Sequence, residues 1–191
     1  FGIYRNYKDV QNAPVTVNLH NVDSLAIVGS RNVTLPYIRG LVSQIAGMAS
    51  PEDVSIFLFS SIQNYKQWEW LRWLPQTSQK PGNRSHSMAF SRNDNKYLFS
   101  LLSGFLSNRS PINDNLPQET VDQESTGFFL NIFDSDLDVR TEPGFSLLVN
   151  QGSQLNAASV FLCKTLEDVP SDCKAVIQIN DTEHLEYWQV G

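Results

Sequence analysis

Four continuous apolar runs dominate the hydrophobic pattern of this chain. They cover Leu25–Gly29, Val54–Ser60, Phe128–Asp134 and Ala158–Cys163. Hydrophobicity that is continuous rather than alternating is typical of strands buried on both faces, as in a parallel sheet. A helical pattern separates the first run from the second, so the chain contains a βαβ unit, which is right-handed by default. The pattern predicts an α/β fold with a mostly parallel central sheet and helices on both faces.

Apolar residues at helical spacing predict the helices that connect these strands. We expect helices over Thr34–Gly47, Asn64–Leu74, Tyr97–Leu106 and Phe145–Asn150. Thr34 is a suitable N-cap for the first helix, and Pro36 is tolerated in a first helical turn. Pro75 stops the second helix, and Asn93 or Asp94 is expected to cap the third.

Shorter segments complete the predicted sheet. Val15–Leu19 alternates as a half-buried strand does, and a short strand is expected around Met88–Phe90. Lys174–Ile179 and His184–Val190 are expected to pair as a closing hairpin, which gives the sheet an antiparallel C-terminal extension. The polar segment Asn108–Thr126 has no periodicity, so it is the best candidate for a surface loop or a variable insert.

Composition narrows the classes of protein that the chain can represent. Its 191 residues, with 41% hydrophobic and 18% charged, suit one globular domain with its own core. No apolar run approaches the ~18 residues that a membrane span requires. The net charge of −6 is unsuited to a phosphate backbone, so nucleic acid is not an expected partner. The chain begins at Phe1, and we expect it to be a piece of a longer protein. Cys163 and Cys173 have no metal-spaced partners and are interpreted as reduced structural thiols.

The loop after the first strand is the position where an α/β nucleotide-binding protein holds a phosphate. Counted from Gly29, the template G-x-x-x-x-G-K-[ST] requires Gly, Lys and Ser or Thr at three positions where this chain has Thr34, Leu35 and Pro36. The wrapping glycine, the cation and the metal-binding hydroxyl are therefore all missing. Arg31 could still attract an anion, but the simpler interpretation is a plain strand-to-helix turn. We expect no nucleotide cofactor and no catalytic residue.

Asp134 ends an apolar strand, where an NTPase places the aspartate that organises its metal ion. The next residue is Ser135, where such enzymes usually have a catalytic Glu. A turn-forming Asp is the simpler interpretation, and Asp134 remains only a weak metal candidate. His20, His86 and His184 have no ligand-spaced partners on a common element, so no metal site is expected.

Three of the four tryptophans, Trp68, Trp70 and Trp73, lie in the predicted Asn64–Leu74 helix. All three could belong to the core. A short helix seldom buries three indoles completely, however, because each is large and its N–H needs a partner. We therefore expect at least one of them to be substantially exposed, and we interpret the three as a candidate interface.

The same residues carry a resemblance to a known family. Trp68–Pro75 reads WEWLRWLP, which resembles the W-[DE]-W-x-[KR]-W-L-P-H segment of the FtsK/SpoIIIE-type ATPases of type VII secretion, the EccC/EssC proteins. Leu41–Val54 and Leu166–Ile177 resemble further segments of that family in the expected order. The resemblance runs from about Val15 to the end of the chain. Departures are Gln76, where the family often has His, and the polar segment Asn108–Thr126.

The resemblance is to the degenerate ATPase-like domain between the transmembrane helices and the first tandem ATPase domain of these proteins. It implies a RecA-like, P-loop NTPase-like fold over residues 1–191, without a Walker lysine. It also implies a membrane-anchored parent that is an ATPase, with this domain on the cytoplasmic side of the cell membrane. The implied partners are neighbouring ATPase domains, the transmembrane part of the same chain and other subunits of a secretion complex.

Two functions remain open at this stage. The first is a non-catalytic scaffold or regulatory module of a secretion motor. The second is a nucleotide-binding or NTP-hydrolysing domain with an unorthodox phosphate loop.

Overall fold

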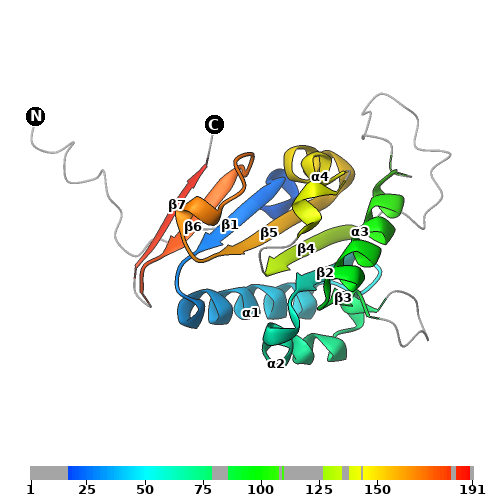
Figure 1. The fold of residues 1–191 in the computed structure, drawn as a ribbon, viewed down its shortest axis with the longest axis horizontal. Helices are drawn as coiled ribbons and strands as arrows, with labels where there is room; N and C mark the ends of the chain where they lie inside the picture. Colours follow the sequence, from blue (N-terminus) through cyan, green and yellow to red (C-terminus); the bar gives the residue numbers. More distant parts are fainter. Residues whose placement is uncertain are drawn as a thin grey trace, which may run out of the picture.

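The computed structural model describes residues 17–78, 86–107, 109, 127–134, 138–142, 144–181 and 184–189. The described residues form one seven-stranded sheet in the order β3-β2-β4-β5-β1-β6-β7 (Figure 1). The strands are β1 (Ser24–Val28), β2 (Val54–Ser60), β3 (Met88–Ala89), β4 (Phe128–Asp134), β5 (Ala157–Cys163), β6 (Ala175–Ile179) and β7 (Leu185–Gln189). β1 to β6 are parallel, and β7 pairs antiparallel with β6. The predicted mostly parallel sheet with an antiparallel C-terminal extension is confirmed.

Helices cover both faces of the sheet, as predicted. The α-helices are α1 (Arg31–Met48), α2 (Tyr65–Trp68), α3 (Arg92–Ser107) and α4 (Phe145–Gln151). The short 3-10 turns are η2 (Leu19–Asn21), η3 (Ile62–Asn64), η4 (Glu69–Trp73), η5 (Pro75–Thr77), η8 (Asp138–Thr141), η9 (Ser153–Leu155) and η10 (Leu166–Asp168). α1, α2 and η4 pack on one face, and α3 and α4 pack on the other (Figure 1).

The sheet separates two hydrophobic layers, because successive side chains of a strand point to opposite faces. In β2, Ile56 and Leu58 belong to the α1 layer, while Phe57 and Phe59 belong to the α3 layer. The α3 layer is aromatic: Phe133 lies between Phe59 and Phe161, with ring centroids 4.8 and 4.9 Å away and nearly parallel planes. This stack follows from the parallel register, which places the three residues side by side on β2, β4 and β5.

The helix starts differ from the sequence predictions. α1 begins three residues before Thr34, with Ser30 in extended conformation at its N-cap, and Thr34 is buried inside the helix. The predicted N-cap was therefore wrong. α3 begins at Arg92 and not after Asn93 or Asp94, because the Ser91 hydroxyl accepts a hydrogen bond from the Asp94 N–H and so caps the first turn.

Three other predictions need correction or fall outside the structure. The predicted Asn64–Leu74 helix is divided among η3, α2 and η4. Leu19 lies in η2 and not in a strand, and the part of Val15–Leu19 before Val17 lies outside the described residues. The predicted loop Asn108–Thr126 also lies outside them, except for Arg109.

Arg109 joins three segments at the amino ends of β4 and β5. Its guanidinium donates hydrogen bonds to the carbonyl oxygens of Gly127, Leu155 and Asn156 and lies 3.7 Å from the ring centroid of Phe129. Burial lowers the pKa of Arg109 to about 10. Cys163 and Cys173 are both buried, and neither forms a disulfide. None of the described helices has the length and apolar character needed to cross a membrane.

Candidate functional site

The connection between β1 and α1 is short. β1 ends at Val28 and α1 begins at Arg31, so only Gly29 and Ser30 join them. A Cβ on Gly29 would lie 2.5 Å from the carbonyl oxygen of Ile179 in β6, and the Gly29 φ of +154° also favours glycine. The turn is therefore tightly packed against the sheet.

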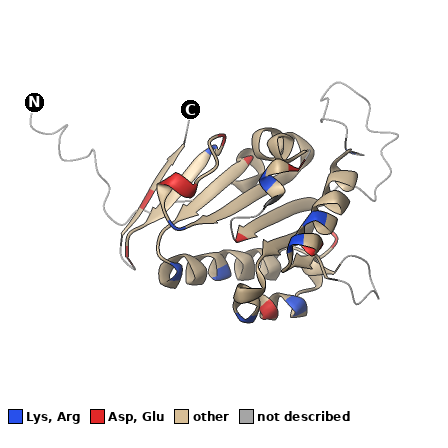
Figure 2. Cartoon of the chain, in the orientation of Figure 1, with Lys and Arg blue, Asp and Glu red and all other residues tan. Residues whose placement is uncertain are grey.

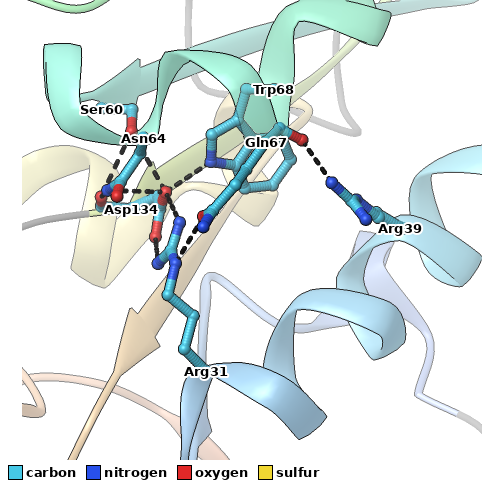
Figure 3. Close-up of polar contacts among 7 residues, drawn as sticks. All are labelled: Arg31, Arg39, Ser60, Asn64, Gln67, Trp68 and Asp134. Carbon is cyan, nitrogen blue, oxygen red and sulfur yellow. Dashed lines mark hydrogen bonds and ion pairs between the residues drawn. The ribbon is translucent and has the colours of Figure 1, made fainter.

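Asp134 lies across from this turn, at the carboxyl end of β4 (Figure 3). The carboxyl ends of parallel strands meet at one edge of the sheet, which is where α/β proteins bind ligands. Asp134 is 2% exposed, and its carboxylate receives a bidentate contact from Arg31, with Nη1–Oδ1 at 2.7 Å and Nη2–Oδ2 at 2.9 Å. Because a buried carboxylate is costly unless it is paired, this contact explains how the fold tolerates Asp134.

Three neutral donors complete the surroundings of Asp134. The Ser60 hydroxyl and the Asn64 amide donate to Oδ2 at 3.1 and 3.3 Å, and the Trp68 indole N–H donates to the same oxygen (Figure 3). A carboxylate offers only about four lone-pair directions. The described donors therefore crowd Oδ2, which receives four of the five contacts, while Oδ1 is held by Arg31 Nη1, so Oδ2 has no direction left for a metal ion.

Arg31 is held from both ends of its guanidinium. Its Nε donates to the Gln67 side chain at 2.5 Å, while its two terminal nitrogens reach Asp134. The hydrogen bond with Asp134 raises the pKa of Arg31, and the charge of Asp134 adds to this effect against the opposing effect of burial. Arg31 is thus a fixed cation, and the anion that it attracts is the carboxylate of Asp134.

A cavity of about 340 Å³ opens at this edge of the sheet. Its lining includes the buried rings Phe133, Phe145 and Phe161, and two exposed cations, Arg140 and Lys164. Arg31 and Asp134 also contribute to its wall. The cavity is large enough for part of a small ligand.

The structure brings together only some of the residues that were compared with the phosphate-loop template, which are Gly29, Arg31, Thr34, Leu35 and Pro36. Gly29, Arg31 and Thr34 line the cavity. Leu35 instead packs into the α1 layer of the core, and Pro36 lies on the exposed side of α1. The weak metal candidate, Asp134, is the centre of a hydrogen-bonded cluster. The cluster contains Ser60 and Asn64, which the sequence did not single out, and Trp68, which was predicted to belong to an interface. One signal could have found Ser60, since it ends β2 as Asp134 ends β4 and pairs with it in register.

The three tryptophans of the candidate interface lie in different environments. Trp68 is fully buried, Trp70 is half-buried and Trp73 is 76% exposed. The expectation that at least one would be substantially exposed is confirmed. Trp68 belongs to the core, because its ring packs in the α1 layer and its N–H reaches Asp134. An interface role is thus open only to Trp70 and Trp73.

The parallel sheet, the helices on both faces and the site at the carboxyl strand ends define an α/β domain of the RecA-like class. No protein-family model matches the sequence. Several solved structures share this fold, among them two of type VII secretion ATPases. The cytoplasmic domain of the type VII secretion ATPase EccC of Thermomonospora curvata aligns with a TM-score of 0.57 and 12% identity, over 87% of this chain and 20% of that one. EssC (ATPases 2 and 3) of Geobacillus thermodenitrificans aligns with a TM-score of 0.55 and 14% identity, over 84% of this chain and 33% of that one.

Relatives found by sequence are also proteins of secretion systems. The ESX secretion system protein YukB of Bacillus subtilis is 38% identical over 72 residues, which are 38% of this chain and 5% of YukB. The ESX secretion system protein EccC of Geobacillus thermodenitrificans is 24% identical over 182 residues, which are 95% of this chain and 12% of that protein. The chain thus spans a small fraction of the length of these relatives. It is similar to one domain of the EccC/EssC proteins of type VII secretion, as the tryptophan motif predicted.

Proposed function

We propose that this chain is a non-catalytic, ATPase-like scaffold or regulatory module of a type VII-like secretion motor. One observation carries the proposal: Arg31 forms a bidentate ion pair with Asp134, the residue that would have to organise Mg²⁺. A cation in this position replaces the metal ion electrostatically. MgATP could then enter only after the pair had separated.

The turn before α1 supports the same proposal. A phosphate-binding loop surrounds phosphate oxygens with backbone N–H groups, while Lys and a metal ion offset their charge. Here two residues connect β1 to α1, and the position expected for Lys is occupied by Leu35, whose side chain packs in the core. The residues at this site therefore do not fit MgATP, and we assign no step of hydrolysis to them.

The cavity favours the alternative, a nucleotide-binding domain with an unorthodox loop. Arg140 and Lys164 are exposed cations on its lining and could attract phosphates. Exposed charge contacts typically contribute only about 0–1 kcal/mol each. Micromolar affinity corresponds to about 8 kcal/mol, so two such contacts fall far short of it, and we rank this alternative second.

Calorimetry with MgATP at millimolar concentration, together with an assay of phosphate release, separates the two functions. We expect neither saturable binding nor phosphate release, both in the unmodified chain and in Arg31→Ala. Saturable micromolar binding that weakened in Arg31→Ala and Arg140→Ala would favour the alternative. Arg72→Ala is the matched control, because Arg72 is an exposed cation that does not line the cavity.

We also propose a setting for this module, on the basis of its similarity to EccC-type proteins. The chain would be a single domain of a longer, membrane-anchored protein and would lie on the cytoplasmic side of the membrane. Its partners would be neighbouring ATPase domains of the same protein and other subunits of a secretion complex. Trp73, and to a lesser extent Trp70, would contact one of these partners. Trp73→Ala in the full-length protein should weaken assembly without unfolding the domain.

A further inference from the structure

The outer side of the α2–η4 segment carries exposed side chains that the fold does not use. Lys66, Glu69, Arg72 and Trp73 are all exposed there, and we call these four residues the Trp73 surface. The Arg72 guanidinium lies 4.9 Å from the centroid of the Trp73 ring. Trp and Arg are the residues most enriched at the energetic centres of protein interfaces. A stacked pair of them, without burial in the core, indicates a surface for a partner.

Charge identifies the kind of partner. The Trp73 surface carries two basic side chains, Lys66 and Arg72, and one carboxylate, Glu69. Figure 2 shows basic and acidic positions along the segment that Figure 1 labels α2. The whole chain, by contrast, has a net charge of −6. The Trp73 surface therefore has a small positive excess in an acidic domain, and a partner that brings a carboxylate to Arg72 complements it.

Arg72 and Trp73 together determine which chemical groups a partner must present to this surface. A guanidinium binds a carboxylate through two parallel N–H donors, and an indole ring offers a flat apolar face. No described residue forms a salt bridge with Arg72. The pair can thus receive a carboxylate and an adjacent apolar side chain at the same time.

We infer that the Trp73 surface binds an acidic protein segment in which an Asp or Glu lies beside an aliphatic or aromatic side chain. The carboxylate pairs with Arg72, and the apolar side chain covers the exposed indole. This inference rests on the interface role proposed above for Trp73 and adds the chemistry of the partner. A bilayer is a poorer match, because attraction to an anionic membrane surface comes from a cluster of several basic residues, whereas the Trp73 surface has Lys66 and Arg72 beside Glu69.

The test uses a labelled helical peptide in which Glu and Leu recur at i, i+4 spacing, titrated into the chain and followed by fluorescence anisotropy. Two matched peptides replace every Glu by Lys or every Leu by Ser. We expect binding of the Glu/Leu peptide alone, weakened by a rise in salt from about 0.1 to 0.5 M because exposed charges are then screened. Trp73→Ala should weaken binding roughly tenfold or more, as for an interface anchor, and Arg72→Glu should abolish it.

Tyr97→Ala is the control variant. Tyr97 is another exposed aromatic, at 65%, but it lies on α3, which packs on the opposite face of the sheet. Its substitution should leave peptide binding unchanged, and circular dichroism should show that all variants are folded.

Several results would overturn the inference. Equal binding of the Lys/Leu peptide would exclude an acidic partner, and unchanged binding in Trp73→Ala would exclude this surface. Sedimentation that showed self-association lost in Trp73→Ala would identify a second copy as the occupant. Binding to anionic vesicles without peptide binding would identify a membrane. If no peptide bound but Trp73→Ala still weakened assembly of the full-length protein, the interface role would stand and the proposed partner chemistry would fail.

Discussion

Trp68 and Trp73 belong to one short segment and yet have opposite environments. Trp68 is fully buried, with its indole N–H on the carboxylate of Asp134. Trp73 is 76% exposed, and the guanidinium of Arg72 lies over its ring. Trp68 thus stabilises the domain, whereas Trp73 contributes surface.

The difference follows from where each residue lies around the segment. α2 ends at Trp68 and continues as the 3-10 turn η4, which has three residues per turn instead of 3.6. Trp68 and Leu71 both face the core, while Trp70 is half-buried and Trp73 points outward. One tryptophan motif therefore serves the core and the surface at once.

The strongest test of the comparison is Trp68→Ala. Removing a fully buried indole leaves a cavity and deprives Asp134 of one donor, so we expect the free energy of unfolding to fall by about 3–5 kcal/mol. Denaturant unfolding followed by circular dichroism measures this loss. A loss below about 1 kcal/mol would mean that Trp68 is not the core residue described here.

A matched pair of Phe substitutions isolates the indole N–H. The Trp68 N–H donates to Asp134, whereas no described residue accepts a hydrogen bond from the buried Trp70 N–H. We expect Trp68→Phe to destabilise by roughly 1–3 kcal/mol and Trp70→Phe to be nearly neutral or stabilising, because an unsatisfied buried donor is itself costly. The same denaturant titration compares the two. Equal losses of unfolding free energy in the two variants would mean that the hydrogen bond from Trp68 to Asp134 adds no measurable stability.

Arg31→Met tests the ion pair at the centre of the Asp134 cluster. Breaking a buried pair typically costs about 3–5 kcal/mol. Arg31 is 38% exposed, so solvent moderates the loss and we expect about 1–2 kcal/mol. Adding Asp134→Asn should recover part of the stability, since no unpaired charge is then buried. A double-mutant cycle gives the coupling, and additive losses would argue against a direct pair.

Trp73→Ala should have the smallest effect on the domain itself. Substitutions at exposed positions usually change the free energy of unfolding by less than about 0.5 kcal/mol. We therefore expect the midpoint of denaturant unfolding to stay nearly constant, in contrast to Trp68→Ala. A large loss would show that Trp73 is part of the core, and the interface proposal would fail with it.

The sheet could be predicted from the sequence because a strand buried on both faces leaves an unbroken apolar run, as Val54–Ser60 does. The helix starts could not be predicted to the residue. Ser30 caps α1 through its extended backbone and Ser91 caps α3 through its hydroxyl, whereas Thr34 and Asp94 were equally plausible by residue type.

The Asp134 cluster was beyond sequence reasoning for a different reason. Its members come from α1, β2, η3 and α2, and only the order of the strands brings them to one edge. The sequence pattern places Asp134 at the end of a strand, but nothing in it identifies Arg31 as its partner. Long-range pairing of this kind has no periodic signature in the chain.

Arg109 has a consequence for how this domain can change in evolution or by design. Its Nη2 donates to the carbonyl oxygen of Gly127 at 2.6 Å, so the chain leaves for residues 110–126 and returns from them at two points joined by one hydrogen bond. We therefore expect a change in the length of that segment to leave the positions of the strands unchanged. Doubling the length of a loop costs only about 0.6 kcal/mol in closure entropy. The domain thus has a built-in insertion point, where sequence can be added or removed while the sheet and the Asp134 cluster keep their geometry.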